Sequence, residues 1–115
     1  MENESKRQRM VARQIQRDLA EIIRGRGMAA FDGAMVTVSG VKMSPDLSLA
    51  RVYVSIFPSD KSQKVMDTLS LQNRSLRGEL GNLVAKQLRI VPELTFFIDD
   101  SLDYVEHIDE LLNKE

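Results

Sequence analysis

The chain has 115 residues, enough for one domain (residues 1–115) with a single core and too few for two. It contains no cysteine, which excludes disulfides, thiolate nucleophiles and thiolate metal ligands, and no apolar run approaches the roughly 20 residues that a membrane span needs. The first ten residues are charged and lack the apolar core of a signal peptide, so we expect a cytoplasmic protein, and its net charge of −1 alone does not suggest a nucleic-acid partner.

The first predicted helix covers residues 4–24 and is amphipathic. Apolar residues at helical spacing, from Val11 to Ile22, gather on one side of a helical wheel. The opposite side carries the basic residues Lys6, Arg9, Arg13, Arg17 and Arg24. We expect the Gly-Arg-Gly run at residues 25–27 to end this helix, because glycine favours helix termination.

Two strands are predicted at residues 35–43 and 49–57. Between them, Pro45 followed by Asp46 is favourable turn chemistry, which indicates a hairpin. In the second strand, valine and isoleucine at positions 52, 54 and 56 alternate with Arg51, Tyr53 and Ser55. We therefore expect a sheet with one face in the core and the other open to water or a partner.

Two helices with a break between them are predicted for residues 58–89. The break is expected at Asn73, Arg74 and Ser75, because Asn and Ser side chains can bond to the local backbone. Leucines at helical spacing continue the second helix to Arg89, and Pro92 ends the pattern because proline cannot continue a helix.

A third strand at residues 94–98 and a final helix complete the predicted elements. β-Branched and aromatic residues fill the strand, and Ser101 is the expected N-cap of the helix that follows. From Leu102 the apolar residues recur at three- and four-residue spacing, so this C-terminal helix is expected to pack back on the body. The first six elements have the order of a type II KH domain, an α+β fold with a three-stranded sheet covered on one face by helices, which commonly binds RNA.

Three segments resemble the ribosome-binding factor A family of small-subunit assembly factors. They are MVARQIQRDLAEII at residues 10–23, VTVSGVKMSPDLSLARVYVS at 36–55 and LRIVPELTFFIDDSLDYVEHIDELL at 88–112. The resemblance implies a non-catalytic KH-like domain that binds the immature 30S subunit and its 16S rRNA. It also implies a role in late maturation and 5′-end processing of precursor 16S rRNA, and release with the help of a ribosome-associated GTPase.

The family usually has an Ala-x-Gly pattern at a kink between its second and third helices. The corresponding residues here are Asn73, Arg74 and Ser75, which depart from that pattern.

The charges are unevenly distributed along the chain. Residues 1–28 hold seven Lys or Arg against four acidic residues, and residues 72–89 hold four against one, so each zone has a net charge of +3. Residues 93–115 carry one lysine against eight acidic residues, a net charge of −7. Two basic zones and one acidic zone result, although charge runs can also be simply solvated faces.

The second helix pair places Arg74, Gly78, Gly81, Ala85 and Arg89 on one narrow stripe. Small residues between arginines can admit an RNA backbone while the guanidinium groups bind phosphate oxygens. They can equally admit a neighbouring element for close packing, and both interpretations stay open. The basic ladder on the first helix likewise could track a phosphate backbone or be a solvated face. The predicted RNA-binding residues are Lys6, Arg9, Arg13, Arg17, Arg74, Arg77, Lys86 and Arg89.

Two other features could contact nucleic acid. Residues 78–81 spell GxxG, the phosphate-binding loop of ordinary KH domains, but Glu79 would repel phosphate, so we favour a helix there. Tyr53 and Phe97 could stack on bases from the less buried face of the sheet. We favour packing for both rings, because only six aromatic residues serve the whole chain.

The sequence contains no pattern typical of an enzyme. His107 is the only histidine and faces away from the apolar side of its predicted helix, and the adjacent Asp99 and Asp100 would point to opposite sides of a strand. No phosphate loop, dinucleotide fingerprint or metal-ligand spacing is present. We predict a monomer without enzymatic activity, cofactor or metal; the alternative function is a protein-interaction module that docks through its acidic C-terminal helix.

Overall fold

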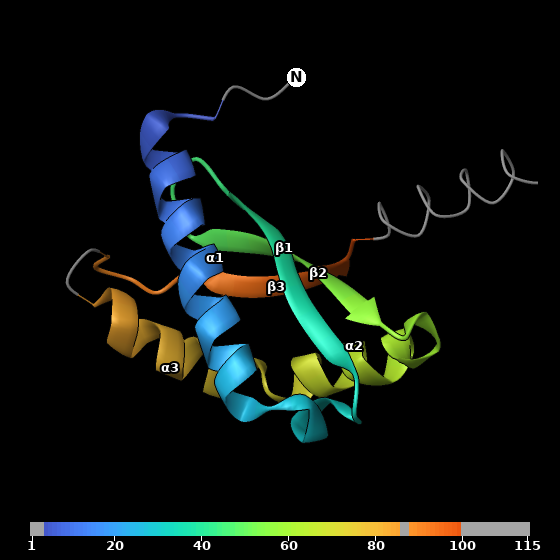
Figure 1. Cartoon of the computed structure of the whole chain (residues 1–115). Coiled ribbons are helices and arrows are strands. Elements are labelled where there is room, and N and C mark those ends of the chain that lie inside the picture. The colour runs from blue at the N-terminus through green and yellow to red at the C-terminus, as the bar shows by residue number, and fades with distance from the viewer. Residues whose placement is uncertain (1–3, 86–87, 100–115) are drawn as a thin grey trace, which may run out of the picture.

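The computed structural model describes residues 4–85 and 88–99 and contains the first six predicted elements in the predicted order (Figure 1). They are α1 (Lys6–Arg26), β1 (Met35–Met43), β2 (Leu49–Phe57), α2 (Ser62–Leu71), α3 (Asn73–Val84) and β3 (Glu93–Ile98), with short 3-10 helices at Met28–Phe31 and Ser59–Lys61. The predicted C-terminal helix, with Ser101 and His107, lies outside the described residues, as does Lys86. Within the described ranges, no helix combines the length and the hydropathy needed to cross a membrane.

Local side-chain and backbone chemistry determines both ends of α1. At its start, Ser5 Oγ accepts a hydrogen bond from Gln8 N at 3.0 Å and Ser5 N donates to Gln8 Oε1 at 2.7 Å, which forms a capping box. At its end, Gly27 adopts a φ of 82°, a conformation that glycine takes without steric cost. The helix passes through Gly25, so it begins and ends two residues later than predicted.

β1 and β2 form the predicted antiparallel hairpin with the predicted bounds. In the loop between them, Asp46 Oδ1 accepts hydrogen bonds from Ser44 Oγ and Ser48 Oγ, each at 2.7 Å, and from Ser48 N at 3.1 Å. The Asp that the sequence places after Pro45 therefore organises the turn. A register shift beside Ser39 adds a bulge to β1 that local patterning did not indicate.

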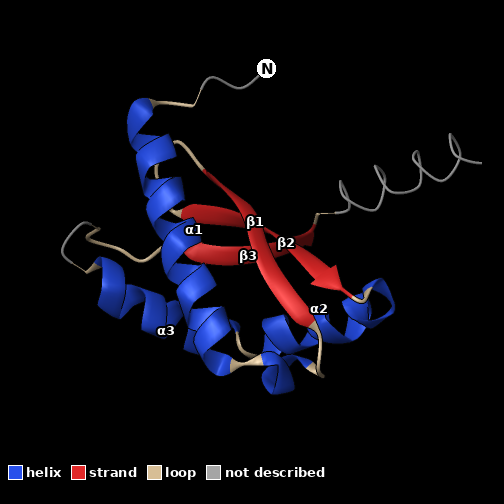
Figure 2. Ribbon diagram, viewed as in Figure 1, coloured by secondary structure: helices blue, strands red, loops and turns tan. Residues whose placement is uncertain are grey.

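The sheet has the order β1-β2-β3, and β3 runs parallel to β2. The three helices lie on one side of it (Figure 2). Residues at positions 50, 52, 54 and 56 of β2 are buried, whereas the alternate residues at 49, 51, 53 and 55 are only half-buried. This confirms the predicted α+β architecture, in which helices cover one face of a three-stranded sheet.

The hydrophobic core lies between the helices and the covered face of the sheet. Fully buried side chains come from every helix and from the central strand: Ile15, Leu19, Val52, Val54, Val65, Leu69, Leu76, Leu80 and Val84. Burial of each large aliphatic side chain contributes about 1.5–3 kcal/mol of transfer free energy. This packing holds α1 beside α3, an arrangement that the surface described below depends on.

A single residue, Gln72, separates α2 from α3. The break therefore falls one residue before the predicted position, and Asn73 and Ser75 lie in the first turn of α3. Asn73 Nδ2 donates to the carbonyl oxygen of Leu94 at 2.9 Å, which attaches the start of α3 to β3. The other end of α3 is Val84, five residues before the predicted end at Arg89.

Gly78 and Gly81 both lie inside α3, so the GxxG sequence does not form a loop. A Cβ added at Gly81 would lie 2.9 Å from Cγ2 of Val91, whereas one added at Gly78 would meet nothing within 4 Å. Gly81 thus permits close packing of α3 against the segment before β3, as the packing interpretation of the small-residue stripe requires. Gly78 has no such packing role.

Candidate nucleic-acid interface

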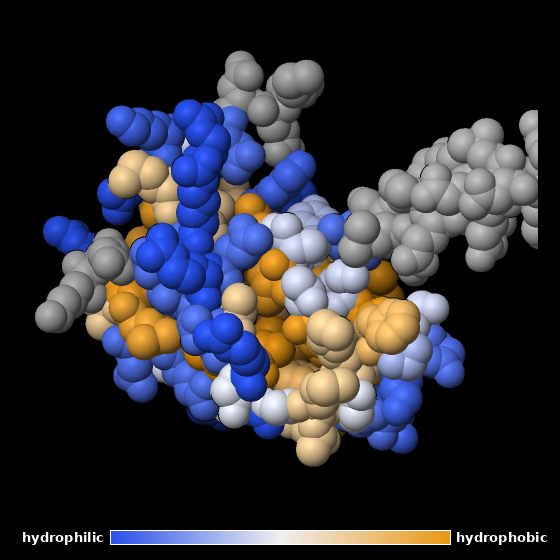
Figure 3. Space-filling model, viewed as in Figure 1, coloured by the Kyte–Doolittle hydropathy of each residue, from blue (hydrophilic) through white to orange (hydrophobic). Residues whose placement is uncertain are grey.

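The outer face of α1 exposes a ladder of basic side chains, Lys6, Arg9, Arg13 and Arg17, and appears as a blue band in the space-filling view (Figure 3). Arg9 Nη1 donates to the carbonyl oxygen of Glu4 at 2.6 Å. Lys6, Arg13 and Arg17 have no hydrogen-bond or ion-pair partner among the described residues. Their charges face solvent and are free to meet phosphate groups.

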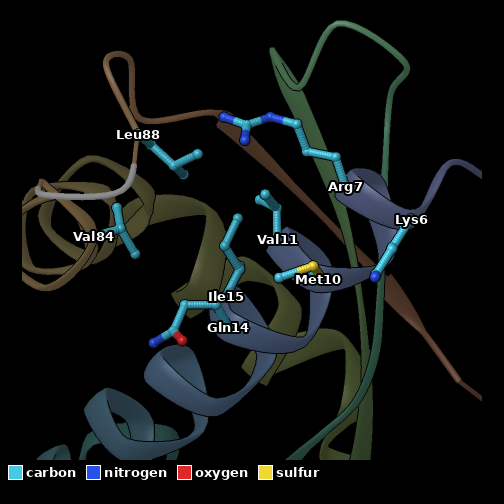
Figure 4. A pocket seen from close by; sticks show the side chains of 8 residues that line it. All are labelled: Lys6, Arg7, Met10, Val11, Gln14, Ile15, Val84 and Leu88. Carbon is cyan, nitrogen blue, oxygen red and sulfur yellow. The ribbon is translucent and has the colours of Figure 1, made fainter.

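A cavity of about 660 Å³ opens between the N-terminal half of α1 and the C-terminal end of α3, and we call it the α1–α3 groove. Its walls are apolar side chains from both sides, Met10, Val11, Ile15, Val84 and Leu88, and its basic residues are Lys6 and Arg7. Figure 4 shows the side chains of the walls converging and Arg7 extending across the groove toward Leu88. Among the described residues, no acidic side chain lines the groove.

A second cavity of about 480 Å³ adjoins the α1–α3 groove, because Arg7 and Leu88 line both. Arg89 also lines the second cavity, and Asp46 is the one acidic residue among its described lining. The two basic zones of the sequence therefore meet in space, with Arg7 from the first and Arg89 from the second around one continuous depression.

Arg7 is absent from the set of residues predicted from the sequence, because it does not share the face of the basic ladder. The spacing does contain a usable signal: Arg7 and Val11 are four residues apart on a helix, so they share one face at the edge of the apolar side. That Leu88 completes the other wall depends on packing between distant segments, which helical spacing does not specify.

Arg74 and Arg77, the other two described cations of the second basic zone, do not line this depression. Arg77 Nε donates to the carbonyl oxygen of Pro92 at 3.1 Å and Arg77 Nη2 to that of Val91 at 2.8 Å, so this guanidinium holds the segment before β3 in place. Arg74 is exposed but lies in the first turn of α3, roughly 15 Å along the helix axis from the end that borders the groove. Arg74 and Arg89 therefore do not act as two ends of one short phosphate clamp.

Arg26 joins the end of α1 to the junction between α2 and α3. Its Nη1 donates to Gln72 Oε1 at 2.7 Å, its Nη2 donates to Ser75 Oγ at 2.8 Å, and Nη2 lies 3.0 Å from Glu79 Oε1. The Arg26 side chain is 18% exposed, and its Nε is buried without a partner among the described atoms. Arg26 thus shapes the kink together with Ser75, a role that no local pattern indicates.

Tyr53 and Phe97 are register partners on β2 and β3 and lie on the face that the helices leave open. Their ring centroids are 5.5 Å apart with an interplanar angle of 26°, so the rings stack on each other. Phe97 is 39% exposed. The two rings share the predicted face, and their packing is mutual rather than against the core.

The described residues contain no group of three His, Cys, Asp or Glu side chains that could hold a metal ion. Hydrogen bonds from the side chains of Ser48 and Ser44 lower the pKa of the exposed Asp46 carboxyl group from 3.8 to about 2. This shift has its cause in the hairpin turn and marks a structural contact.

The element order, the mixed sheet and its single helical layer define a KH-like domain, here with an exposed basic helix face. The chain belongs to the ribosome-binding factor A family, whose model matches residues 7–112. The ribosome-binding factor A of Cytophaga hutchinsonii is 37% identical over 111 residues, 96% of this chain and 84% of that relative. That of Flavobacterium johnsoniae is 40% identical over 110 residues, covering 95% and 85%.

Solved structures of the family share this fold. The crystal structure of ribosome-binding factor A from Thermus thermophilus has a TM-score of 0.68 and 28% identity, covering 79% of this chain and 94% of that chain. A homology model of the Thermus thermophilus factor, fitted into an electron cryo-microscopy map of its complex with the 30S subunit, has a TM-score of 0.62 and 30% identity, covering 76% and 90%. The resemblance seen in the sequence and the KH-like fold are both confirmed.

Proposed function

We propose that this protein binds the small ribosomal subunit through its 16S rRNA and acts as a non-catalytic assembly factor. The observation that carries the proposal is that Arg7 and Arg89, from the two basic zones, line one cavity that adjoins the α1–α3 groove, beside the ladder on the outer face of α1. Membership of the ribosome-binding factor A family and the similarity to a relative fitted into a 30S complex support it.

The cations would act through phosphate contacts. Each phosphate neutralised by Lys or Arg releases condensed counterions. The logarithm of the binding constant therefore falls by about 0.7–0.9 for each phosphate contact when the salt concentration rises tenfold. The net charge of −1 is compatible with binding to phosphate groups, because the acidic excess is confined to residues 93–115. The α1 face thus presents local positive charge whatever the total charge of the chain.

Assistance in late maturation and in 5′-end processing of the precursor follows from differential affinity. A factor that binds one arrangement of the immature rRNA more tightly than its alternatives shifts the population toward that arrangement. The factor is released when the mature arrangement, which it binds less tightly, forms. In this proposal the factor acts as a cytoplasmic monomer, and a ribosome-associated GTPase promotes its release.

Co-sedimentation of the full chain with mature and immature small subunits over a range of salt tests the proposal. We expect more protein on immature particles and a steep loss with salt. Arg13→Gln should weaken binding and reduce the salt slope by about 0.7–0.9, because one phosphate contact is lost. Lys64→Gln is the matched control, since Lys64 lies on α2 and pairs with Asp32 at 3.5 Å.

Equal partition onto both kinds of particle would reject the maturation role. A salt slope that Arg13→Gln leaves unchanged, with binding retained, would reject RNA contact by α1 and favour docking on a basic protein through the acidic C-terminal residues.

A further inference from the structure

The α1–α3 groove combines features that a plain phosphate-binding surface does not need. Its walls are apolar side chains, yet the charged residues that line it, among those the structure describes, are basic only, Lys6 and Arg7. Phosphates require cations and gain nothing from apolar walls, so an occupant of the whole groove must carry negative charge beside an apolar or aromatic group. A single-stranded nucleotide has this chemistry, because its base presents a flat ring and its flanking phosphates are anionic.

The size and shape of the groove suit such a group. Its volume of about 660 Å³ falls within the roughly 300–1,000 Å³ of small-molecule sites, which leaves room for a base and its sugar. Val11, Val84 and Leu88 would bury the faces of a ring inserted between α1 and the end of α3 (Figure 4).

Arg7 supplies a second element of base recognition. It extends across the groove and lines the adjoining cavity as well, so a guanidinium plane lies where an inserted base would enter (Figure 4). Planar guanidinium groups stack on unpaired bases and also bind phosphate, which lysine does only as a point charge. Among the described residues Arg7 has no hydrogen-bond or ion-pair partner that would hold it elsewhere.

An acidic amphipathic protein helix would also match apolar walls and a basic rim. The continuity of the surrounding charge favours RNA: Arg13 and Arg17 extend the cations along α1 on one side, and Arg89 extends them on the other. Cations therefore flank the apolar walls both on α1 and in the adjoining cavity, as a polynucleotide backbone on either side of an inserted base requires.

We propose that the α1–α3 groove holds one unstacked base of the bound RNA, with the Arg7 guanidinium stacked on it and Lys6 and Arg89 on the flanking phosphates. This inference rests on the proposed RNA-binding function and specifies the site and the state of the nucleotide that it takes.

Two RNA hairpins that differ only by one bulged adenosine test the proposal with the full chain. We expect the bulged hairpin to bind at least roughly fivefold more tightly, since stacking of one base contributes about 1–3 kcal/mol. With 2-aminopurine as the bulged nucleotide, its fluorescence should change on binding, because the base exchanges water for the groove.

Arg7→Lys is the decisive variant, because it keeps the charge and removes the planar group. It should abolish most of the preference for the bulge and leave the salt slope of both hairpins unchanged. Arg13→Lys, the same replacement on the same helix outside the groove, should leave the preference and the slope as they are.

Equal binding of both hairpins, or a preference that survives Arg7→Lys, would overturn the base site and leave the proposed RNA binding intact. If neither hairpin bound in a salt-dependent manner, the result would instead contradict the proposed RNA-binding function itself. A synthetic peptide of residues 99–115 could instead bind the protein, with an affinity that Arg7→Lys reduces. If the two hairpins then also bound equally well, the groove would be assigned to an acidic protein segment and the proposal would be overturned.

Discussion

Arginine serves three different physical purposes on this small domain. Arg26 is largely buried and bonds to side chains at the helix junction, Arg77 bonds to the backbone before β3, and Arg13 faces solvent with no partner among the described residues. The chemistry of the side chain is the same in each case, and the surroundings determine whether it stabilises the fold or is available to a ligand.

Arg26→Ala should lower the free energy of unfolding by about 1–3 kcal/mol, because it removes contacts to Gln72, Ser75 and Glu79 in a poorly solvated place. Urea denaturation measures the change. Arg24→Ala is the control: Arg24 is 75% exposed and pairs with Glu21 in the same helix, so its removal should cost less than about 0.5 kcal/mol. Similar losses for both variants would contradict the anchoring role.

The stability contributed by Asp46 should depend on pH. Hydrogen bonds from Ser48 and Ser44 stabilise the carboxylate and hold its pKa at about 2, below the ordinary 3.8. Because the folded pKa is the lower one, the stabilisation is fully present above about pH 4 and is lost as the pH falls through about 2. NMR titration of the Asp46 carboxyl group in the folded protein should give a midpoint near the lower value.

Asp46→Asn should therefore be less stable than the wild type at neutral pH, and the difference should shrink below pH 4. Asp60→Asn is a suitable control, since Asp60 is also exposed and accepts no side-chain hydrogen bond among the described residues. A stability difference that stays constant down to pH 2 would show that the turn does not depend on the ionised carboxylate.

At the scale of elements, two sides of α3 pack against different parts of the molecule. One side packs Leu76, Leu80 and Val84 into the core. Another approaches the segment before β3 so closely at Gly81 that a methyl group would lie 2.9 Å from Val91. A glycine in a helix costs roughly 0.5–1 kcal/mol relative to alanine, and only Gly81 has a packing reason that offsets this cost.

The two glycines of α3 should respond differently to replacement by alanine. Gly78→Ala should raise the free energy of unfolding by about 0.5–1 kcal/mol, because it adds helix propensity in open space. Gly81→Ala should give no gain or a loss, because the same benefit is opposed by overpacking against Val91. Thermal and urea unfolding of both variants measure the contrast. Equal stabilisation by both would mean that α3 does not depend on close approach at Gly81.

At the scale of the whole molecule, packing of α1 beside α3 brings together charges that are some eighty residues apart in the chain. Arg7 and Arg89 line one cavity, while Arg74 lies at the other end of α3. The KH-like fold thus places cations from both basic zones around one cavity, even though the chain as a whole is close to neutral.

Double-mutant cycles on RNA binding test this grouping of Arg7 with Arg89. Arg7→Gln and Arg89→Gln should be non-additive in binding free energy, because both side chains border the same cavity. Arg7→Gln and Arg74→Gln should be additive within about 0.5 kcal/mol, because the length of α3 separates them. Filter binding at fixed salt gives the four affinities of each cycle. Additivity in the first cycle would argue against a shared site.

Much of the candidate surface follows from helical spacing alone. The basic ladder from Lys6 to Arg17 needs only the periodicity of one helix, and the structure confirms that these side chains share an exposed face. Arg77 looked equivalent to its neighbours in the sequence, but long-range packing places the backbone carbonyl groups of Val91 and Pro92 beside it. Arg7 is the opposite case: it was not predicted as a binding residue, and it lines the groove only because the end of α3 packs beside α1.

The amino-acid sequence by itself determined the six elements, their order, the hairpin bounds and the open face of the sheet, because capping, turn chemistry and hydrophobic periodicity act over a few residues. Only the tertiary structure decided the position of the break at Gln72, the anchoring role of Arg26 and the meeting of Arg7 with Arg89. These features arise where segments distant in the chain come into contact, and local spacing contains no information about which side chains will face each other there.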